Sequence, residues 1–465
     1  MKSASPQVLR QTARDVFIEK IGHELPKDDN GNPIMDLFSE GERVPKVEAR
    51  EITVGRVLGR GGFCVVRDCT LSMSSSASVG SNSSKGSFFG RLTSSGSVRN
   101  NSSSINSLRD NSSHIRSMSS SGHRSISSER SSSSVPMRFR RAKGAMKSRY
   151  VVKQLTPELK EQDKITYMKG VVDLATETRF LGALDHPHII KLEGVSTCDA
   201  FSDGYFIILE KMSETLSKKV KGWMDLDRQC KGITGVFTGS KHKIQRLQSE
   251  RIAAAYDLAI GMKFLHEQNI AFRDLVSMAF GTFERCFAAT IFHSSLLFVP
   301  LFYQKPDNIG FNYVGLLKIF DFGLAKELKE KDLEKDGLYR HMTRMTGAVR
   351  YMSPENARGL PYGLTTDVYS WAMIMWFVLA LEPPFAMYTE KMILERVCER
   401  GYRPKVFNAW TPRMAKVISR SWDADPTKRP SFSTIAEELK KELQEVDPRL
   451  ASMVEQSEEL GGVPE

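Results

Sequence analysis

Residues 52–66 read ITVGRVLGRGGFCVV, two apolar runs separated by a glycine-rich turn. β-Branched residues are frequent in both runs, which predicts two strands joined by a turn at Gly59, Gly61 and Gly62. Glycine strings of this kind also occur in dinucleotide-binding folds, but there a helix follows the glycines. A second strand follows them here, so the pattern favours a strand–loop–strand unit.

A pair of opposite charges is predicted farther along the chain. Lys153 ends a short apolar strand, and Glu177 shares a helical stripe with Leu174 and Leu181 within the predicted helix 168–184. A charge on a core-facing surface is costly unless it has a partner. We therefore expect Lys153 and Glu177 to pair with each other.

Other segments outline the rest of the fold. Residues 205–209 and 316–320 predict strands, residues 225–249 a polar loop, and residues 250–268 an amphipathic helix. The run from Trp371 to Leu381 is apolar on every side and too short to span a bilayer. It predicts a buried central helix.

The order of motifs along residues 51–445 resembles that of eukaryotic protein kinases. The glycine turn, Lys153 and Glu177 come first. The later motifs are Leu209-Glu210-Lys211-Met212, Phe272-Arg273-Asp274, Asp321-Phe322-Gly323, Ser353-Pro354-Glu355, Asp367 and Arg429.

The resemblance implies an α+β fold of the bilobal protein kinase type. A small antiparallel β-sheet lobe with one helix would face a larger, mainly helical lobe, with ATP between them. It also implies Mg²⁺-dependent transfer of the γ-phosphate of ATP to protein substrates, a reaction that depends on positioning and charge neutralisation.

The resemblance further assigns roles to matching residues. Asp274 would accept the proton of the substrate hydroxyl, Lys153 would hold the α- and β-phosphates, and Arg429 would pair with Glu355. Cys64 stands where a third glycine is usual, either as a tolerated small residue or as a redox-sensitive thiol. The catalytic residues would be Asp274, Lys153, Glu177 and Lys305, the metal ligands Asn308 and Asp321, and the nucleotide-binding residues Gly59, Gly61, Gly62, Val66, Leu209, Glu210 and Met212.

Several features bear on specificity and activity. Lys305-Pro306-Asp307-Asn308 resembles serine/threonine kinases, and the segments 401–404 and 422–432 resemble the tyrosine-kinase-like group. Ala348 stands where a threonine or serine is usual, which motivates the alternative of a pseudokinase or ATP-binding scaffold. Phe272 replaces the usual histidine, and its ring is expected to pack behind Phe322.

The catalytic-loop sequence is split in two by residues 276–304. Removing these 29 residues restores the five-residue step from Asp274 to Asn308. In the chain as written, base and metal ligand are therefore expected to be pushed apart, which favours the pseudokinase interpretation for this form.

Three interpretations of residues 276–304 compete. A membrane helix needs about 20 apolar residues, and the apolar stretch 287–303 is shorter and contains Pro300. A loop insertion costs only about 3 kcal/mol of closure entropy, but it would place a Phe/Leu-rich segment where the loop must be preorganised. We favour a retained intron, because Val276-Ser277 can be encoded as GTAAGT and Gln304 as CAG, a typical splice donor and acceptor end. Transcript reads through codons 276–304 would contradict it.

A second insertion, residues 72–149, separates two strands that a tight turn usually joins. It holds 13 Lys/Arg and two acidic residues, so it accounts for the whole net charge of +11. Of its residues 72–134, 29 are serines, a composition that predicts disorder. All six arginines there have a serine three residues later. The segment is either low-complexity filler or an arm regulated by phosphorylation.

The remaining features predict the setting of the domain. Six cysteines without metal-binding spacing, and no apolar leader, favour free thiols and a cytoplasmic location, with a nuclear one as the alternative. The balanced charge outside 72–149 argues against a specific nucleic-acid partner, and no membrane span is predicted. Residues 1–50, which have no strong periodicity, are interpreted as a short helical preface, and residues 446–465 as an acidic flexible tail. The sequence gives no indication of an oligomeric state.

Overall fold

The computed structural model describes residues 6–21, 44–72, 149–159, 164–231, 240–276, 308–329, 342–343 and 346–459. The expectations for the serine-rich stretch, for residues 277–304 and for Lys305 lie outside these ranges.

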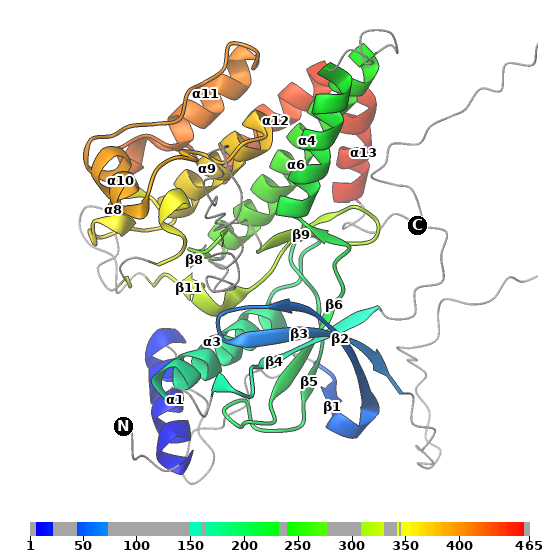
Figure 1. Cartoon of the computed structure of the whole chain (residues 1–465), viewed down its shortest axis with the longest axis vertical. Helices are drawn as coiled ribbons and strands as arrows, with labels where there is room; N and C mark the ends of the chain where they lie inside the picture. The colour runs from blue at the N-terminus through cyan, green and yellow to red at the C-terminus, as the bar shows by residue number, and fades with distance from the viewer. Residues whose placement is uncertain are drawn as a thin grey trace, which may run out of the picture. The chain divides into compact units, whose positions relative to one another are not determined.

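A six-stranded sheet forms the core of the small lobe, in the order β1-β5-β6-β4-β3-β2 (Figure 1). The neighbouring strands pair antiparallel except β1 with β5, which are parallel. The predicted antiparallel sheet of a bilobal α+β fold is therefore confirmed, and the two-residue β1 adds one parallel pair at its edge. Its strands are β1 (Lys46–Val47), β2 (Ile52–Arg60), β3 (Cys64–Leu71), β4 (Tyr150–Leu155), β5 (Leu192–Ser196) and β6 (Phe206–Glu210).

The insertion at 72–149 joins two strands that are direct neighbours. β3 pairs with β4, and Cys69 lies opposite Tyr150. Both ends of the insertion are tied to the domain, because Ser72 donates its N–H to the carbonyl of Glu51 (2.8 Å) and the carbonyl of Arg149 accepts the N–H of Lys211 (3.0 Å). The long connection therefore replaces a short one without disturbing the sheet.

Two helices accompany this sheet, where one was predicted. α3 (Lys164–Ala183) corresponds to the predicted helix 168–184. The additional helix, α1 (Pro6–Ile21), packs beside α3 (Figure 1). It forms because Ala13 and Phe17, one helical turn apart, share a face that becomes buried.

The large lobe is mainly helical. Its principal helices are α4 (Leu216–Lys231), α6 (Ser240–Glu267), α9 (Thr365–Ala380), α11 (Pro412–Ser421), α12 (Phe432–Val446) and α13 (Pro448–Glu459), with the shorter α8 (Pro354–Ala357) and α10 (Glu390–Met392) between them. Every residue from Trp371 to Val378 in α9 is buried, as the uniformly apolar run predicted. Among the described segments, none forms a helix with the length and apolar character needed to cross a membrane.

Two expectations about this lobe are wrong. Residues 225–231 belong to α4 and residues 240–249 to α6, because Trp223 and Leu247 supply buried contacts that the polar composition conceals. The predicted flexible tail from residue 446 is instead helical over 448–459. Leu450 and Val454 of α13 lie one turn apart and are both buried in the main core.

Short strands flank several of the predicted site residues. β7 (Glu214–Thr215), β9 (Ile309–Phe311) and β10 (Leu317–Ile319) form one small sheet. β8 (Ile270–Ala271) and β11 (Lys326–Glu327) form another. Asn308 directly precedes β9, Asp321 follows β10 by two residues, and β8 ends directly before Phe272.

Candidate active site

Lys153 lies at the centre of a buried charge cluster. Its Nζ is 2.6 Å from Oε2 of Glu177 on α3 and 3.0 Å from Oδ1 of Asp321. Burial alone would lower the pKa of the Lys153 ammonium, but the carboxylates of Asp321 and Glu177 outweigh burial and raise it. Burial raises the pKa of Glu177, and the ammonium opposes that rise. The pairing predicted from the sequence is present, and it joins β4, α3 and the segment after β10.

The backbone at Asp321-Phe322-Gly323 is held in an unusual conformation. Asp321 has φ of 69°, in the left-handed region that a non-glycine residue adopts at a cost. The ring of Phe322 packs edge-on against Phe272, with centroids 5.0 Å apart, as predicted. A Cβ on Gly323 would lie 3.1 Å from the Cβ of Asp173 on α3, so this position favours glycine. These contacts fix the carboxylate of Asp321 beside Lys153.

Asp274 and Asn308 meet despite the residues between them in the chain. Asn308 Nδ2 donates to the backbone carbonyl of Asp274 (2.7 Å) and to its carboxylate Oδ2 (3.2 Å). The expectation that the chain as written holds base and metal ligand apart is therefore wrong. The backbone N–H of Phe320 donates to the carbonyl of Asn308 (3.0 Å), which also ties Asn308 to the strand leading to Asp321.

The carboxylate of Asp274 has capacity for a further partner. Burial raises the pKa of Asp274 well above its usual value, Asp321 adds to the rise, and the hydrogen bond from Asn308 opposes it. Its Oδ1 accepts no hydrogen bond from any described residue. Ala348, which directly follows Gly347, is buried and has no hydroxyl that could donate to Asp274. A Cβ on Gly347 would lie 3.4 Å from this oxygen and 2.8 Å from the carbonyl of Arg273.

Sequence reasoning missed the support beneath the catalytic loop. Asp367 of α9 accepts the backbone N–H groups of Phe272 and Arg273, both at 2.8 Å, and its Oδ2 lies 3.1 Å from Nε2 of His266. Arg273 has φ of 68° and donates its Nε to the carbonyl of Leu324 (2.8 Å). The available signal was an aspartate at the start of a mostly apolar predicted helix. Such a carboxylate is buried with the helix, as Asp367 is, and then needs several donors.

The glycine-rich turn fits a phosphate group. No atom lies within 4 Å of a Cβ placed on Gly59 or Gly62, and the nearest atom to one on Gly61 is 3.7 Å away. The turn is closed by a hydrogen bond from the N–H of Gly61 to the carbonyl of Cys64 (2.7 Å). Val66 lies between Gly59 and Lys153 in the register of the sheet. Backbone amides beside open space, next to a buried ammonium, suit a negatively charged ligand.

The predicted nucleotide-binding residues at 209–212 differ in the groups that they present. Leu209 is buried opposite Val151. The carboxylate of Glu210 is already engaged, since it accepts the N–H of Lys191 (2.9 Å) and pairs with Lys318 Nζ (2.8 Å). The side chain of Glu210 is therefore directed to Lys318 of β10.

Phe320 is a second residue that sequence reasoning missed. A Cβ on Gly310 would lie 3.1 Å from the Phe320 ring and 3.6 Å from Cγ of Met212. Phe320 directly follows β10, whose Lys318 pairs with Glu210. The absent side chain at Gly310 thus makes room for an aromatic ring beside Met212.

Cys64 is buried in the small-lobe core. Burial raises the pKa of the Cys64 thiol to about 12, so the thiolate is strongly disfavoured at neutral pH. This supports the interpretation of Cys64 as a tolerated small residue rather than a redox-sensitive thiol.

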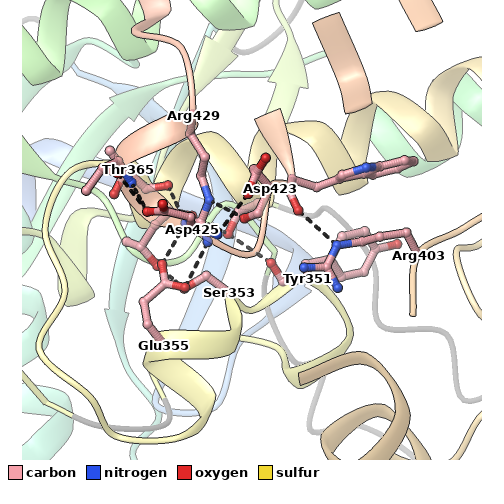
Figure 2. Close-up of polar contacts among 12 residues, drawn as sticks. Tyr351, Ser353, Glu355, Thr365, Arg403, Asp423, Asp425 and Arg429 are labelled. Atoms are coloured by element: carbon pink, nitrogen blue, oxygen red, sulfur yellow. Dashed lines mark hydrogen bonds and ion pairs between the residues drawn. The ribbon is translucent and has the colours of Figure 1, made fainter. Parts of the chain in front are cut away.

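A buried ion pair anchors the segment that follows Ala348. Arg429 Nη1 and Nη2 lie 2.6 and 2.9 Å from the two carboxylate oxygens of Glu355, as the resemblance had implied (Figure 2). Arg429 also donates to the carbonyls of Asp423 (2.9 Å) and Thr365 (3.0 Å). The pair therefore connects α8 with the start of α9 and with the loop before α12.

Comparison with known proteins agrees with this geometry. A family model described as protein tyrosine and serine/threonine kinase matches residues 138–280 and 305–439, more than half of the chain. The chain belongs to this protein kinase family. The match leaves out residues 281–304, most of the interruption that splits the catalytic-loop sequence.

Individual relatives are more distant. The chain is 29% identical to serine/threonine-protein kinase STY17 of Arabidopsis thaliana over 44% of this chain and 30% of that protein. It is 26% identical to serine/threonine/tyrosine-protein kinase HT1 of Arabidopsis thaliana over 64% of this chain and 62% of that protein. It is 27% identical to dual specificity protein kinase zakA of Dictyostelium discoideum over 57% of this chain and 29% of that protein. The chain thus spans less than two thirds of each of these relatives.

Proposed function

We propose that this chain is an active protein kinase that uses ATP and Mg²⁺ to phosphorylate serine and threonine hydroxyls of protein substrates. The observation that carries the proposal is the assembly of two sets of polar contacts, with Asp321 of one set close enough to Asp274 of the other to raise its pKa. Lys153 forms ion pairs with Glu177 and Asp321, and Asn308 donates hydrogen bonds to Asp274. Together these groups supply a cation for phosphates, two oxygen ligands for a metal and a buried base.

Each group has a defined task in this reaction. MgATP supplies the phosphoryl group and the cation that neutralises its charge. Lys153, held by Glu177, would bind the α- and β-phosphates under the open glycine turn. Asp321 and Asn308 offer oxygen atoms, which Mg²⁺ prefers. Oδ1 of Asp274 is the atom to which a substrate hydroxyl would donate its proton.

The proposal of serine/threonine specificity rests on Lys305-Pro306-Asp307-Asn308. Relatives named as dual specificity or serine/threonine/tyrosine kinases make tyrosine the alternative acceptor. Matched peptide libraries with a central Ser, Thr or Tyr, assayed with labelled ATP, separate the two. Transfer to tyrosine at a rate equal to that for serine would refute the narrower specificity.

A loss-of-function series tests the activity itself. Lys153→Met and Asp274→Asn should each abolish transfer to a generic substrate, whereas Lys221→Met, at an exposed position of α4, should retain it. The full chain and a chain without residues 276–304 are assayed in parallel. If Lys153→Met is as active as the parent in both backgrounds, the chain is not the source of the activity.

A scaffold without phosphotransfer is the competing function, and one observation favours it. Oδ1 of Asp274 has no described partner, and Ala348 lacks the hydroxyl that would fill this role. A scaffold would bind MgATP with no turnover, and Ala348→Thr would restore transfer. An active parent enzyme that Ala348→Thr leaves unchanged would rule it out.

A further inference from the structure

The face of α1 that meets the rest of the small lobe is built around two apolar residues. Phe17 is fully buried and Ala13 is 1% exposed. The ring of Phe17 packs edge-on against Phe201, in the segment between β5 and β6, with centroids 5.5 Å apart. Both residues belong to the same core cluster as Val171 and Ala175 of α3. The helix is therefore an integral part of the core.

A polar contact fixes the register of α1 against the same segment. The guanidinium of Arg14 forms an ion pair with Asp199 and lies over the ring of Phe201, 5.7 Å from its centroid. Asp199 is itself held in place, because its Oδ1 accepts the N–H of Phe201 (2.8 Å). One side chain of α1 thus contacts both a charge and a ring on a single rigid turn.

The burial pattern of α3 shows that this helix is covered on more than one side. Residues 174–178 are all buried, and five consecutive residues at about 100° each span more than a full turn. The sheet can cover only one face. Tyr167, Val171 and Ala175 recur every four residues, so they share one stripe, and the hydroxyl of Tyr167 bonds to Asp203 in the segment that also carries Phe201.

The other sides of α3 carry the catalytic contacts. Glu177 reaches Lys153, and the ring of Phe180 lies 6.1 Å from that of Phe322. At Gly170 the glycine turn comes so close that a Cβ would lie 2.8 Å from the Cβ of Phe63. α1 also lies beside β11, which follows Asp321 in the chain. α1 therefore borders α3, which carries Glu177, and β11, which begins five residues beyond Asp321.

We propose that α1 is a positioning element that holds α3 in the orientation in which Glu177 pairs with Lys153. Phe17, Ala13 and Arg14 are then positioning residues that act through Glu177. The inference rests on the proposed kinase function, but it also concerns nucleotide binding, because Lys153 faces the phosphates whether or not transfer follows. Without α1, α3 would lose its contacts with this helix and would keep those with the sheet and with residues 322–324.

The test compares single substitutions in the full-length chain, well below its unfolding temperature. Phe17→Ala should lower kcat/KM and weaken binding of a fluorescent MgADP analogue by about tenfold, within the range of typical coupling between sites. Val16→Ala, on the same helix but 42% exposed, should change both by less than about twofold. Melting temperatures show that every variant is folded at the assay temperature.

Two double variants keep the test decisive if Phe17→Ala does not fold. Arg14→Glu places like charges together and should weaken MgADP binding, and Arg14→Glu with Asp199→Arg should restore it. In a Glu177→Gln background, Arg14→Glu should cause no further loss, because the residue through which α1 acts is already removed.

The outcomes separate the two proposals. If Phe17→Ala and Arg14→Glu lower only the melting temperature and leave kcat/KM and MgADP affinity equal to those of Val16→Ala, α1 is purely a stabilising element and the inference is overturned. An additive loss in the Glu177→Gln background also overturns it. If the parent shows no phosphotransfer but MgADP affinity responds as described, the proposed function fails and the role of α1 stands.

Discussion

Removal of the Arg429 guanidinium is the perturbation whose consequences the structure defines best (Figure 2). The Arg429 side chain is fully buried, Glu355 is 7% exposed, and the two charged groups make a bidentate contact at 2.6 and 2.9 Å. Arg429→Leu leaves the Glu355 carboxylate buried without its counter-ion. It also removes the donors to the carbonyls of Asp423 and Thr365.

The expected cost follows from this geometry. Removing one partner of a buried ion pair typically costs about 3–5 kcal/mol, and we expect about 4 kcal/mol for Arg429→Leu. Arg400→Leu is the matched control, since Arg400 Nη2 also lies 2.6 Å from a carboxylate, that of Glu395, but both side chains are exposed. Exposed pairs contribute little, so this change should cost no more than about 0.5 kcal/mol.

A double-mutant cycle distinguishes a stranded charge from lost packing. Glu355→Leu with Arg429→Leu removes both charges, so the double variant should be more stable than the sum of the singles predicts, by about 3 kcal/mol. Urea denaturation followed by tryptophan fluorescence measures each free energy of unfolding. Additive costs, or an Arg429→Leu cost as small as that of Arg400→Leu, would refute the reasoning.

Three further predictions address the loop, its support and the response to pH. Gly347→Ala should lower kcat by about tenfold or more, because the new Cβ would lie 2.8 Å from the carbonyl oxygen of Arg273. The control is Gly401→Ala, which is also at positive φ but has no atom within 4 Å of the new Cβ. It should cost about 1 kcal/mol of stability and leave kcat unchanged. Asp367→Asn should cost about 3 kcal/mol in urea denaturation and lower kcat, since an amide oxygen replaces only one of the carboxylate acceptors; equal stability would contradict it. His186 Nδ1 accepts the N–H of His188 (3.1 Å), and burial lowers the pKa of His186 to about 4. Folding therefore favours the neutral imidazole of His186. Its contribution to stability is complete above the unfolded-state pKa near 6.5 and is lost as the pH falls toward 4. We expect a loss of about 1 kcal/mol at pH 5 after allowance for partial exposure. His186→Asn should flatten that part of the melting-temperature profile, and an unchanged slope would count against His186 as its source.

Local patterns were sufficient to predict the elements whose own residues decide their structure. The β2–turn–β3 unit has its glycines between β-branched runs, and α9 is apolar on every side. The pairing of Lys153 with Glu177 was predictable because each charge stands on an apolar surface and needs a partner. In these cases a few adjacent or periodic residues carry the whole argument.

Elements stabilised by contacts distant in the sequence were harder to predict. Among the α1 residues whose exposure is described, only Ala13 and Phe17 are buried, and the helix is held by Phe17 against Phe201, a contact between segments far apart in the chain. α13 has an acidic composition but buries Leu450 and Val454. The hydrogen bonds from the catalytic loop to Asp367 link residues 94 and 95 positions apart. No periodicity in one segment reveals its partner.

The two halves of the catalytic loop are positioned independently of the residues that separate them. On one side, β8 pairs with β11, and Asp367 holds the backbone at Phe272 and Arg273, which sets the position of Asp274. On the other side, β9 pairs with β7 and β10, and the N–H of Phe320 binds the carbonyl of Asn308. All of these supports lie outside residues 276–304. The positional objection to a loop insertion is therefore weaker than the sequence suggested, because preorganisation of Asp274 and Asn308 does not require a short connection. The preference for a retained intron then rests on composition and on the codons that residues 276, 277 and 304 permit, and sequencing of the mature transcript decides between the two.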